Sequence, residues 1–141
     1  MNKKVQIVTS AFIQNQNKFL IVKRAADETF LPNMWELPGG KVEPEENPNI
    51  SVLREIQEEC GLKIAVINPG VINSYVSKER NIHYVEIFYL CTIMNKTDEV
   101  KLSEEHSEYQ WISKGDLENF KFEMTEYMID TINTLYNRIT N

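Results

Sequence analysis

The sequence predicts a protein of the α/β class, in which a mixed sheet lies packed between helices. Runs of β-branched and aromatic residues precede, separate and follow two segments with helical periodicity. Elements in that order pack as layers around one core. A length of 141 residues, of which 42% are hydrophobic and 26% charged, suits a single domain over residues 1–141.

Two runs near the start predict a β-hairpin. Residues 5–13 and 19–22 are apolar and β-branched, and the polar residues 14–17 between them form the turn. Residues 25–35 have weak periodicity and predict a loop. At the end of this loop we expect Trp35 to anchor the core, with a stacking surface as the alternative.

The next segment, between Asn47 and Gly61, predicts a helix of about 13 residues. Asn47 is a favourable N-cap, Pro48 fits the first helical position, and Gly61 supplies the left-handed residue that ends helices. At about 100° per residue, the apolar side chains share one arc that must face a core. They are Val52, Leu53, Ile56 and Cys60.

Three glutamates of this helix share a neighbouring arc. Glu55, Glu58 and Glu59 are close enough for like charges to repel by a few tenths of a kcal/mol per pair, and Arg54 relieves only part of that. One interpretation is a solvated acidic face. The other is a site for a hard divalent cation, Mg²⁺ or Mn²⁺, because such ions take oxygen ligands and offset the repulsion. Glu46 adds a fourth acid at the helix entry and favours the cation site.

The middle of the chain predicts two further strands. Residues 64–72 form a strand that bends or bulges at Pro69 and Gly70. Residues 77–81 form a polar turn. Residues 83–94 are the strongest strand in the chain, because they are long and rich in aromatic side chains.

The last third of the chain predicts a loop, a strand and two helices. Residues 95–107 are polar and acidic, and residues 109–112 form a short strand. Ser113 or Asp116 is expected to cap a brief helix after that strand. Residues 125–139 carry apolar side chains at helical spacing and predict a terminal helix that covers the core.

Charge and cysteine usage limit the partners and the compartment. A net charge of −6 at pH 7, without a basic stripe, argues against a nucleic acid polymer or an anionic membrane as partner. There is no secretory segment and no apolar run near 18 residues, so no membrane span is expected. Cys60 and Cys91 sit in apolar patterns typical of buried, unpaired thiols. We therefore expect a cytoplasmic protein.

Residues 40–62 resemble the Nudix box, in which Gly, five residues, Glu and seven residues precede Arg-Glu-aliphatic-x-Glu-Glu-x-Gly-aliphatic. Every fixed position is met, by Gly40, Glu46, Arg54, Glu55, Ile56, Glu58, Glu59, Gly61 and Leu62. Residues 24–27 and 35–43 extend the resemblance toward the MutT-type nucleoside triphosphate pyrophosphohydrolases. The resemblance implies an α/β/α sandwich and cleavage of a (deoxy)nucleoside triphosphate to the monophosphate and pyrophosphate. Gly39 and Gly40 are expected to form a tight backbone turn before the helix.

The resemblance also implies a metal site for Mg²⁺ or Mn²⁺. Glu55, Glu58 and Glu59 would be carboxylate ligands, directly or through water, and Gly39 would offer its backbone carbonyl. Glu55 would also orient or deprotonate the attacking water, and Arg54 would fix the carboxylates. Glu46 would be an auxiliary acid. A further acid is expected from the loop before Trp111, with Glu105 as the best match and Glu104 and Glu108 as rivals.

The expected substrate contacts are Arg24, Lys41 and Glu126. The guanidinium of Arg24 matches a phosphate contact, since its planar fork suits oxyanions. Glu126 falls near the position at which MutT-type enzymes read a purine with an asparagine. That departure argues against specificity for oxidised guanine.

Two other functions are the alternatives. One is hydrolysis of ADP-ribose or another nucleotide sugar, although the proline expected after the box is replaced by Ser77 and Lys78. The other is a non-catalytic nucleotide sensor, against which the intact glutamates argue. A monomer and a homodimer both stay open.

Overall fold

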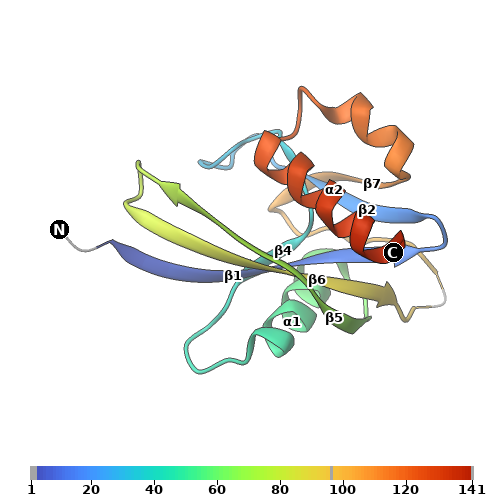
Figure 1. Ribbon diagram of the computed structural model, residues 1–141, viewed down its shortest axis with the longest axis horizontal. Coiled ribbons are helices and arrows are strands. Elements are labelled where there is room, and N and C mark those ends of the chain that lie inside the picture. The colour runs from blue at the N-terminus through green and yellow to red at the C-terminus, as the bar shows by residue number, and fades with distance from the viewer. Residues whose placement is uncertain (1–2, 96, 141) are drawn as a thin grey trace.

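The computed structural model describes residues 3–95 and 97–140, which form a mixed sheet with helices on both faces (Figure 1). The strands of this part of the chain are β1 (Lys4–Asn15), β2 (Lys18–Arg24), β3 (Trp35–Glu36), β4 (Gly39–Lys41), β5 (Ile64–Ser77), β6 (Ile82–Ile93) and β7 (His106–Ile112). Its helices are α1 (Pro48–Cys60), the 3₁₀ helix η1 (Lys114–Phe120) and α2 (Glu126–Thr140). The predicted α/β/α sandwich is confirmed.

One parallel pairing runs through the middle of the sheet. Strand β1 lies parallel to β6 from Lys4 opposite Ile82 to Gln14 opposite Thr92. The other pairings are antiparallel: β5 with β6, β2 with β1, β4 with β1, and β3 and β7 with β2. The predicted hairpin of the first two strands is therefore present, and the sheet is mixed as expected.

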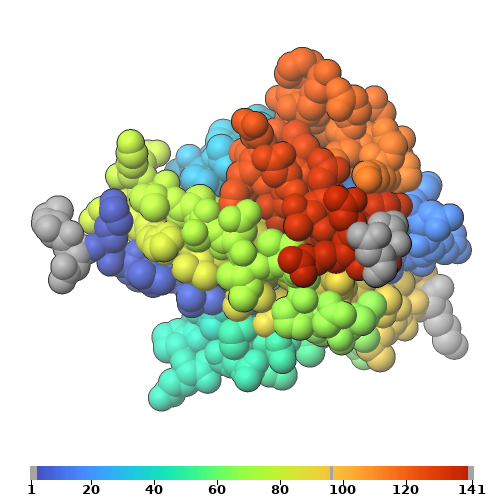
Figure 2. Space-filling model, in the orientation of Figure 1, coloured from blue at the N-terminus to red at the C-terminus, as the bar shows by residue number. Residues whose placement is uncertain are grey.

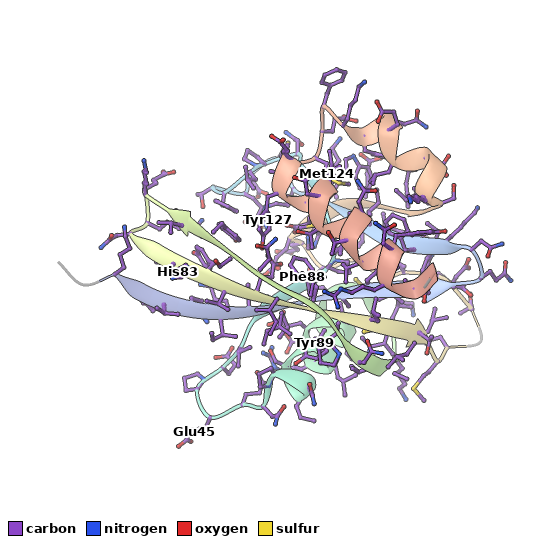
Figure 3. The ribbon with its side chains drawn as sticks, in the orientation of Figure 1. Glu45, His83, Phe88, Tyr89, Met124 and Tyr127 are labelled. Atoms are coloured by element: carbon purple, nitrogen blue, oxygen red, sulfur yellow. The ribbon has the colours of Figure 1, made fainter. Side chains whose placement is uncertain are left out.

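Each face of the sheet has its own apolar core. Helix α1 buries Val52, Ile56 and Cys60 on one face, and α2 and η1 cover the other. Neighbouring residues of β6 show the alternation in Figure 3, where Phe88 lies on the α2 side and Tyr89 on the α1 side. Figure 2 shows the C-terminal segment, orange and red, covering the upper side of the molecule, with the α1 segment on the opposite side.

Local predictions agree with the structure, with two refinements. Strand β5 continues past the predicted bend, and its register with β6 shifts on both sides of Asn68 and Pro69, as a bulged strand requires. The brief helix after β7 is a 3₁₀ helix, in which Asp116 accepts hydrogen bonds from the backbone N–H and hydroxyl of Ser113. Trp35 is buried in the core.

The two cysteines are as the sequence predicted. Cys60 and Cys91 are both buried and form no disulfide. Of the helices that the structure describes, none has the length and apolar character needed to cross a bilayer.

Candidate active site

Helix α1 is capped at both ends. The side chain of Asn47 accepts a hydrogen bond from the backbone N–H of Asn49 at 2.9 Å. Gly61 adopts a left-handed conformation with φ of 65° and donates its N–H to the carbonyl of Gln57. With its apolar arc held against the sheet, the helix directs its acidic arc toward β4 and the loop before β7.

Arg54 is the central cation of the acidic arc. Its Nε and Nη2 donate to the two oxygens of Glu46 at 2.8 and 2.9 Å. Its Nη1 donates to Glu55 at 2.9 Å and to Glu58 at 3.2 Å, and Nη2 also reaches the carbonyl of Lys41 at 3.1 Å. The guanidinium therefore compensates the charge of three carboxylates. The side chain of Glu58 is 59% exposed, whereas those of Glu46 and Glu55 are mostly buried.

The two glycines before the helix lie in strand β4, so the predicted tight turn was wrong. Neither has a positive φ. A Cβ atom on Gly39 would lie 1.9 Å from the backbone oxygen of Thr9, and one on Gly40 would lie 2.3 Å from the carboxylate of Glu55. Gly39 must be glycine because β4 approaches the backbone of β1 too closely for a Cβ atom, whereas a Cβ atom on Gly40 would displace the carboxylate of Glu55.

A second acidic group forms where α1 meets the start of β7. One ligand atom from each of Glu59, Glu105 and His106 lies within 4.8 Å of the others. Glu59 is 5% exposed, and its carboxylate accepts a hydrogen bond from the N–H of Gly39 at 3.2 Å. Burial, reinforced by the neighbouring Glu105 and Glu55 carboxylates, raises the pKa of Glu59 to about 10.

This group fits a divalent cation. Within the described part of the chain, no lysine or arginine forms an ion pair with Glu59 or Glu105, so no protein cation is placed to keep both carboxyl groups ionised. The Nδ1 atom of His106 is buried and has no hydrogen-bond partner among the described residues. Carboxylate oxygens are the ligands of Mg²⁺ and Mn²⁺, and an imidazole nitrogen extends the donor set.

From the sequence, His106 was expected only within the polar, acidic loop of residues 95–107. The structure places it at the start of β7, where its side chain is 2% exposed and its Nε2 lies 2.9 Å from a carboxylate oxygen of Glu36. A carboxylate behind a histidine fixes the orientation of the ring. Glu36 therefore connects His106 to Arg24, which donates to the same oxygen at 3.3 Å.

Contacts with three neighbouring residues hold the side chain of Arg24 in place. Besides the contact with Glu36, its Nε donates to the carbonyl of Phe30 at 2.6 Å and its Nη2 lies 3.5 Å from Glu28. The side chain keeps 20% exposure and lines both cavities of this region. Its position suits a substrate contact, although two carboxylates share its charge.

Two adjoining cavities define the site. The larger, of about 390 Å³, is bordered by the acidic group and by Lys41, and the smaller, of about 170 Å³, by aromatic side chains. Residues that line both are Arg24, Phe30, Glu36, Tyr75 and Glu86. A polar compartment that opens into an apolar one can hold the charged and the flat parts of one ligand.

The structure brings most of the expected residues together. Glu55, Glu59, Glu105, Gly39 and Lys41 line the larger cavity. Glu46, Arg54 and Glu58 lie behind it, joined by hydrogen bonds. Glu126 does not join them: it is exposed at the first residue of α2 and borders neither cavity.

Two acids that border both cavities were missed. Glu36 lies between Trp35 and Leu37, and Glu86 lies within the apolar run of β6. The available signal was a lone carboxylate in an otherwise apolar strand, since such a residue is rarely buried without a purpose.

Comparison with known proteins places the chain among similar sequences and folds. Residues 4–131 match the family model of the NUDIX domain. The nucleoside triphosphatases NudI of Klebsiella pneumoniae (strain 342) and Escherichia coli O1:K1 are each 30% identical over 122 residues, covering 80% of this chain and 85% of the relative. The MutT protein from Methanosarcina mazei Go1 is 26% identical with a TM-score of 0.83, covering 100% of this chain and 99% of its own.

Proposed function

This chain belongs to the Nudix family, and from that premise we propose that it hydrolyses a nucleoside triphosphate to the monophosphate and pyrophosphate. Membership makes it a hydrolase of phosphoric anhydride bonds. The observation that carries the proposal is the meeting of buried Glu59 with exposed Glu105 at the wall of a cavity that adjoins an aromatic one. Neither carboxyl group pairs with a lysine or arginine of the described chain. The nucleoside triphosphatase relatives support the choice of substrate.

Glu55, Glu59 and Glu105 would hold Mg²⁺ or Mn²⁺, with the backbone carbonyl of Gly39 and with Glu58 through water. When bound, the cation neutralises charge on the phosphate oxygens and makes bound water more acidic. A bound cation would supply the positive charge that Glu59 and Glu105 lack among their protein neighbours, and would keep Glu59 ionised.

Residues of α1 and of the segments around it would take the remaining catalytic and binding roles. Glu55 lies against Gly40 at the cavity wall and would orient the attacking water and accept its proton. Arg54 is a positioning residue, because it reaches the cavity only through the carboxylates that it holds. Glu46 in turn fixes Arg54. Arg24 and Lys41, which both line the larger cavity, would contact the phosphates.

The test is a hydrolysis assay with Mg²⁺ or Mn²⁺ against canonical and oxidised (deoxy)nucleoside triphosphates, ADP-ribose, NADH, dinucleoside polyphosphates and sugar nucleotides. We expect triphosphates to yield pyrophosphate, and Glu59→Gln to lose at least about a hundredfold in kcat because a carboxylate ligand is removed. Glu118→Gln is the matched control, since Glu118 is exposed and pairs only with Lys121 in the described structure.

Other outcomes would contradict the proposal in separable ways. Preference for ADP-ribose would keep the site and change the substrate. Nucleotide binding without turnover of any compound would indicate a sensor. Triphosphate turnover that survives Glu59→Gln would remove the acidic group from the chemistry.

A further inference from the structure

Glu86 is a buried carboxylate that the hydrolytic chemistry does not use. It lies on β6, is 7% exposed, and borders both cavities. Ser10 donates its hydroxyl to Oε2 at 2.5 Å, and Tyr127 donates its hydroxyl to Oε1 at 3.0 Å. Each oxygen thus accepts one hydrogen bond and retains capacity for another.

This carboxylate is costly for the fold. No lysine or arginine of the described chain forms an ion pair with Glu86, and burial raises its pKa to about 7. Apolar side chains usually stabilise such a position better than an unpaired charge. A purely structural role therefore does not account for an acid here, whereas recognition of a ligand does.

The surroundings of Glu86 are shaped for a flat ring. The smaller cavity is bordered by Phe30, Trp35, Tyr75 and Tyr127. Tyr75 stacks near Phe30 with centroids 6.4 Å apart and meets Tyr127 edge to face at 5.0 Å. Tyr127 reaches from α2 toward the sheet, as Figure 3 shows. Aromatic walls with one polar group at the edge are typical of a site that binds a heterocycle in a fixed orientation.

We propose that Glu86 reads the base of the nucleotide by accepting hydrogen bonds from its N–H groups. The inference rests on the proposed function, because it places the base in the aromatic cavity and the phosphates beside Glu59 and Glu105.

The chemistry of a carboxylate fixes the order of preference among bases. Guanine presents a ring N–H and an amino group side by side, which match two acceptor oxygens. Adenine and cytosine present an amino group with a ring acceptor beside it. Uracil and thymine place carbonyl oxygens on both sides of their N–H, and these repel a carboxylate. The site therefore favours guanine first, the other amino bases next, and uracil and thymine last.

Two measurements test this. The first is kcat/KM for GTP, ATP, CTP, UTP and dTTP. We expect GTP to exceed UTP by at least about tenfold, and Glu86→Gln to remove most of that ratio, because an amide offers one acceptor and one donor. The second is the Kd of GMP and UMP without metal, which reports base recognition independently of hydrolysis. Glu118→Gln is the control and should leave both ratios unchanged.

The outcomes separate the two levels of the proposal. Failure to hydrolyse any triphosphate would overturn the proposed function, while the GMP and UMP affinities would still test Glu86. Equal use of guanine and uracil by the wild type, or an unchanged ratio in Glu86→Gln, would overturn the inference. The inference would also be overturned if Glu126→Gln changed the base selectivity and Glu86→Gln did not. If Glu86→Gln fails to fold, Glu86→Asp is the second variant. It keeps the charge but moves the carboxylate oxygens away from the base, so we expect the same loss of the GTP-to-UTP ratio of kcat/KM.

Discussion

Arg54 binds the Glu46 carboxylate through two hydrogen bonds, from Nε to Oε2 at 2.8 Å and from Nη2 to Oε1 at 2.9 Å. This paired geometry leaves Nη1 to hold Glu55 and Glu58. Chiefly through the hydrogen bonds from Arg54, the pKa of Glu46 falls to about 2, so the clamp persists across the neutral range. Glu46 therefore acts on the site through Arg54, because it does not border the cavity itself.

Arg54→Lys should reveal this clamp. A lysine keeps the charge but cannot make parallel bonds to Glu46 while also reaching Glu55. We expect kcat to fall by about a hundredfold, since small displacements of a reacting group have effects of that size. Steady-state kinetics with a thermal melt would check it. A lysine variant with near wild-type kcat would show that charge alone is sufficient.

The adjacent glycines should respond differently to alanine. In Gly40→Ala the new Cβ meets the end of the flexible Glu55 side chain, so we expect a folded protein with kcat lowered by about a hundredfold. In Gly39→Ala it meets the backbone of β1 at Thr9, so we expect a loss of about 1–3 kcal/mol in the free energy of unfolding. Urea denaturation and kinetics of both variants would separate the effects. Equal loss of stability in the two would contradict this assignment.

The loop acids can be distinguished by metal affinity. Glu105→Gln removes a carboxylate from the group with Glu59 and His106, and we expect the Mn²⁺ affinity to fall by at least about tenfold. Glu108 pairs with Lys23 at 3.3 Å, away from that group, so Glu108→Gln is the comparison. Titration of free Mn²⁺ by electron paramagnetic resonance measures binding without turnover. A larger loss in Glu108→Gln or Glu104→Gln would reassign the ligand.

The pKa of Glu86 predicts a pH-dependent stability. Burial raises it from 4.5 to about 7, with Glu36 adding to the rise and the Ser10 and Tyr127 hydroxyls opposing it. Between these values the folded state binds more protons than the unfolded state, so stability falls as pH rises, by up to about 3 kcal/mol. Glu86→Gln lacks this titration and should gain stability relative to wild type between pH 5 and pH 8.

Urea midpoints of both proteins at the two pH values measure this difference. Other carboxylates titrate in both proteins and cancel in the comparison. A stability difference that is the same at pH 5 and pH 8 would show that Glu86 does not titrate in this range.

Local signals in the sequence were enough for most of the fold. Asn47 and Gly61 marked the two ends of α1 correctly, because capping depends on a few neighbouring residues. The hairpin and the strand of β6 followed from alternation and β-branched runs. The role of Gly39 and Gly40 could not be read in this way, since their constraint comes from Thr9 and Glu55, which are distant along the chain.

Some residues of the candidate site could likewise be placed from local sequence, and others could not. The spacing of Arg54, Glu55 and Glu59 placed them on one helical arc before any tertiary information, because helical geometry repeats every 3.6 residues. The resemblance had named Glu105 as the best match for a further acid of the metal site. Tertiary structure alone decided that His106 joins Glu59 and Glu105, that Glu86 borders the aromatic cavity, and that Glu126 stays outside it. Those relations depend on how β6, β7 and α2 pack, and packing between distant segments leaves no periodic trace in sequence.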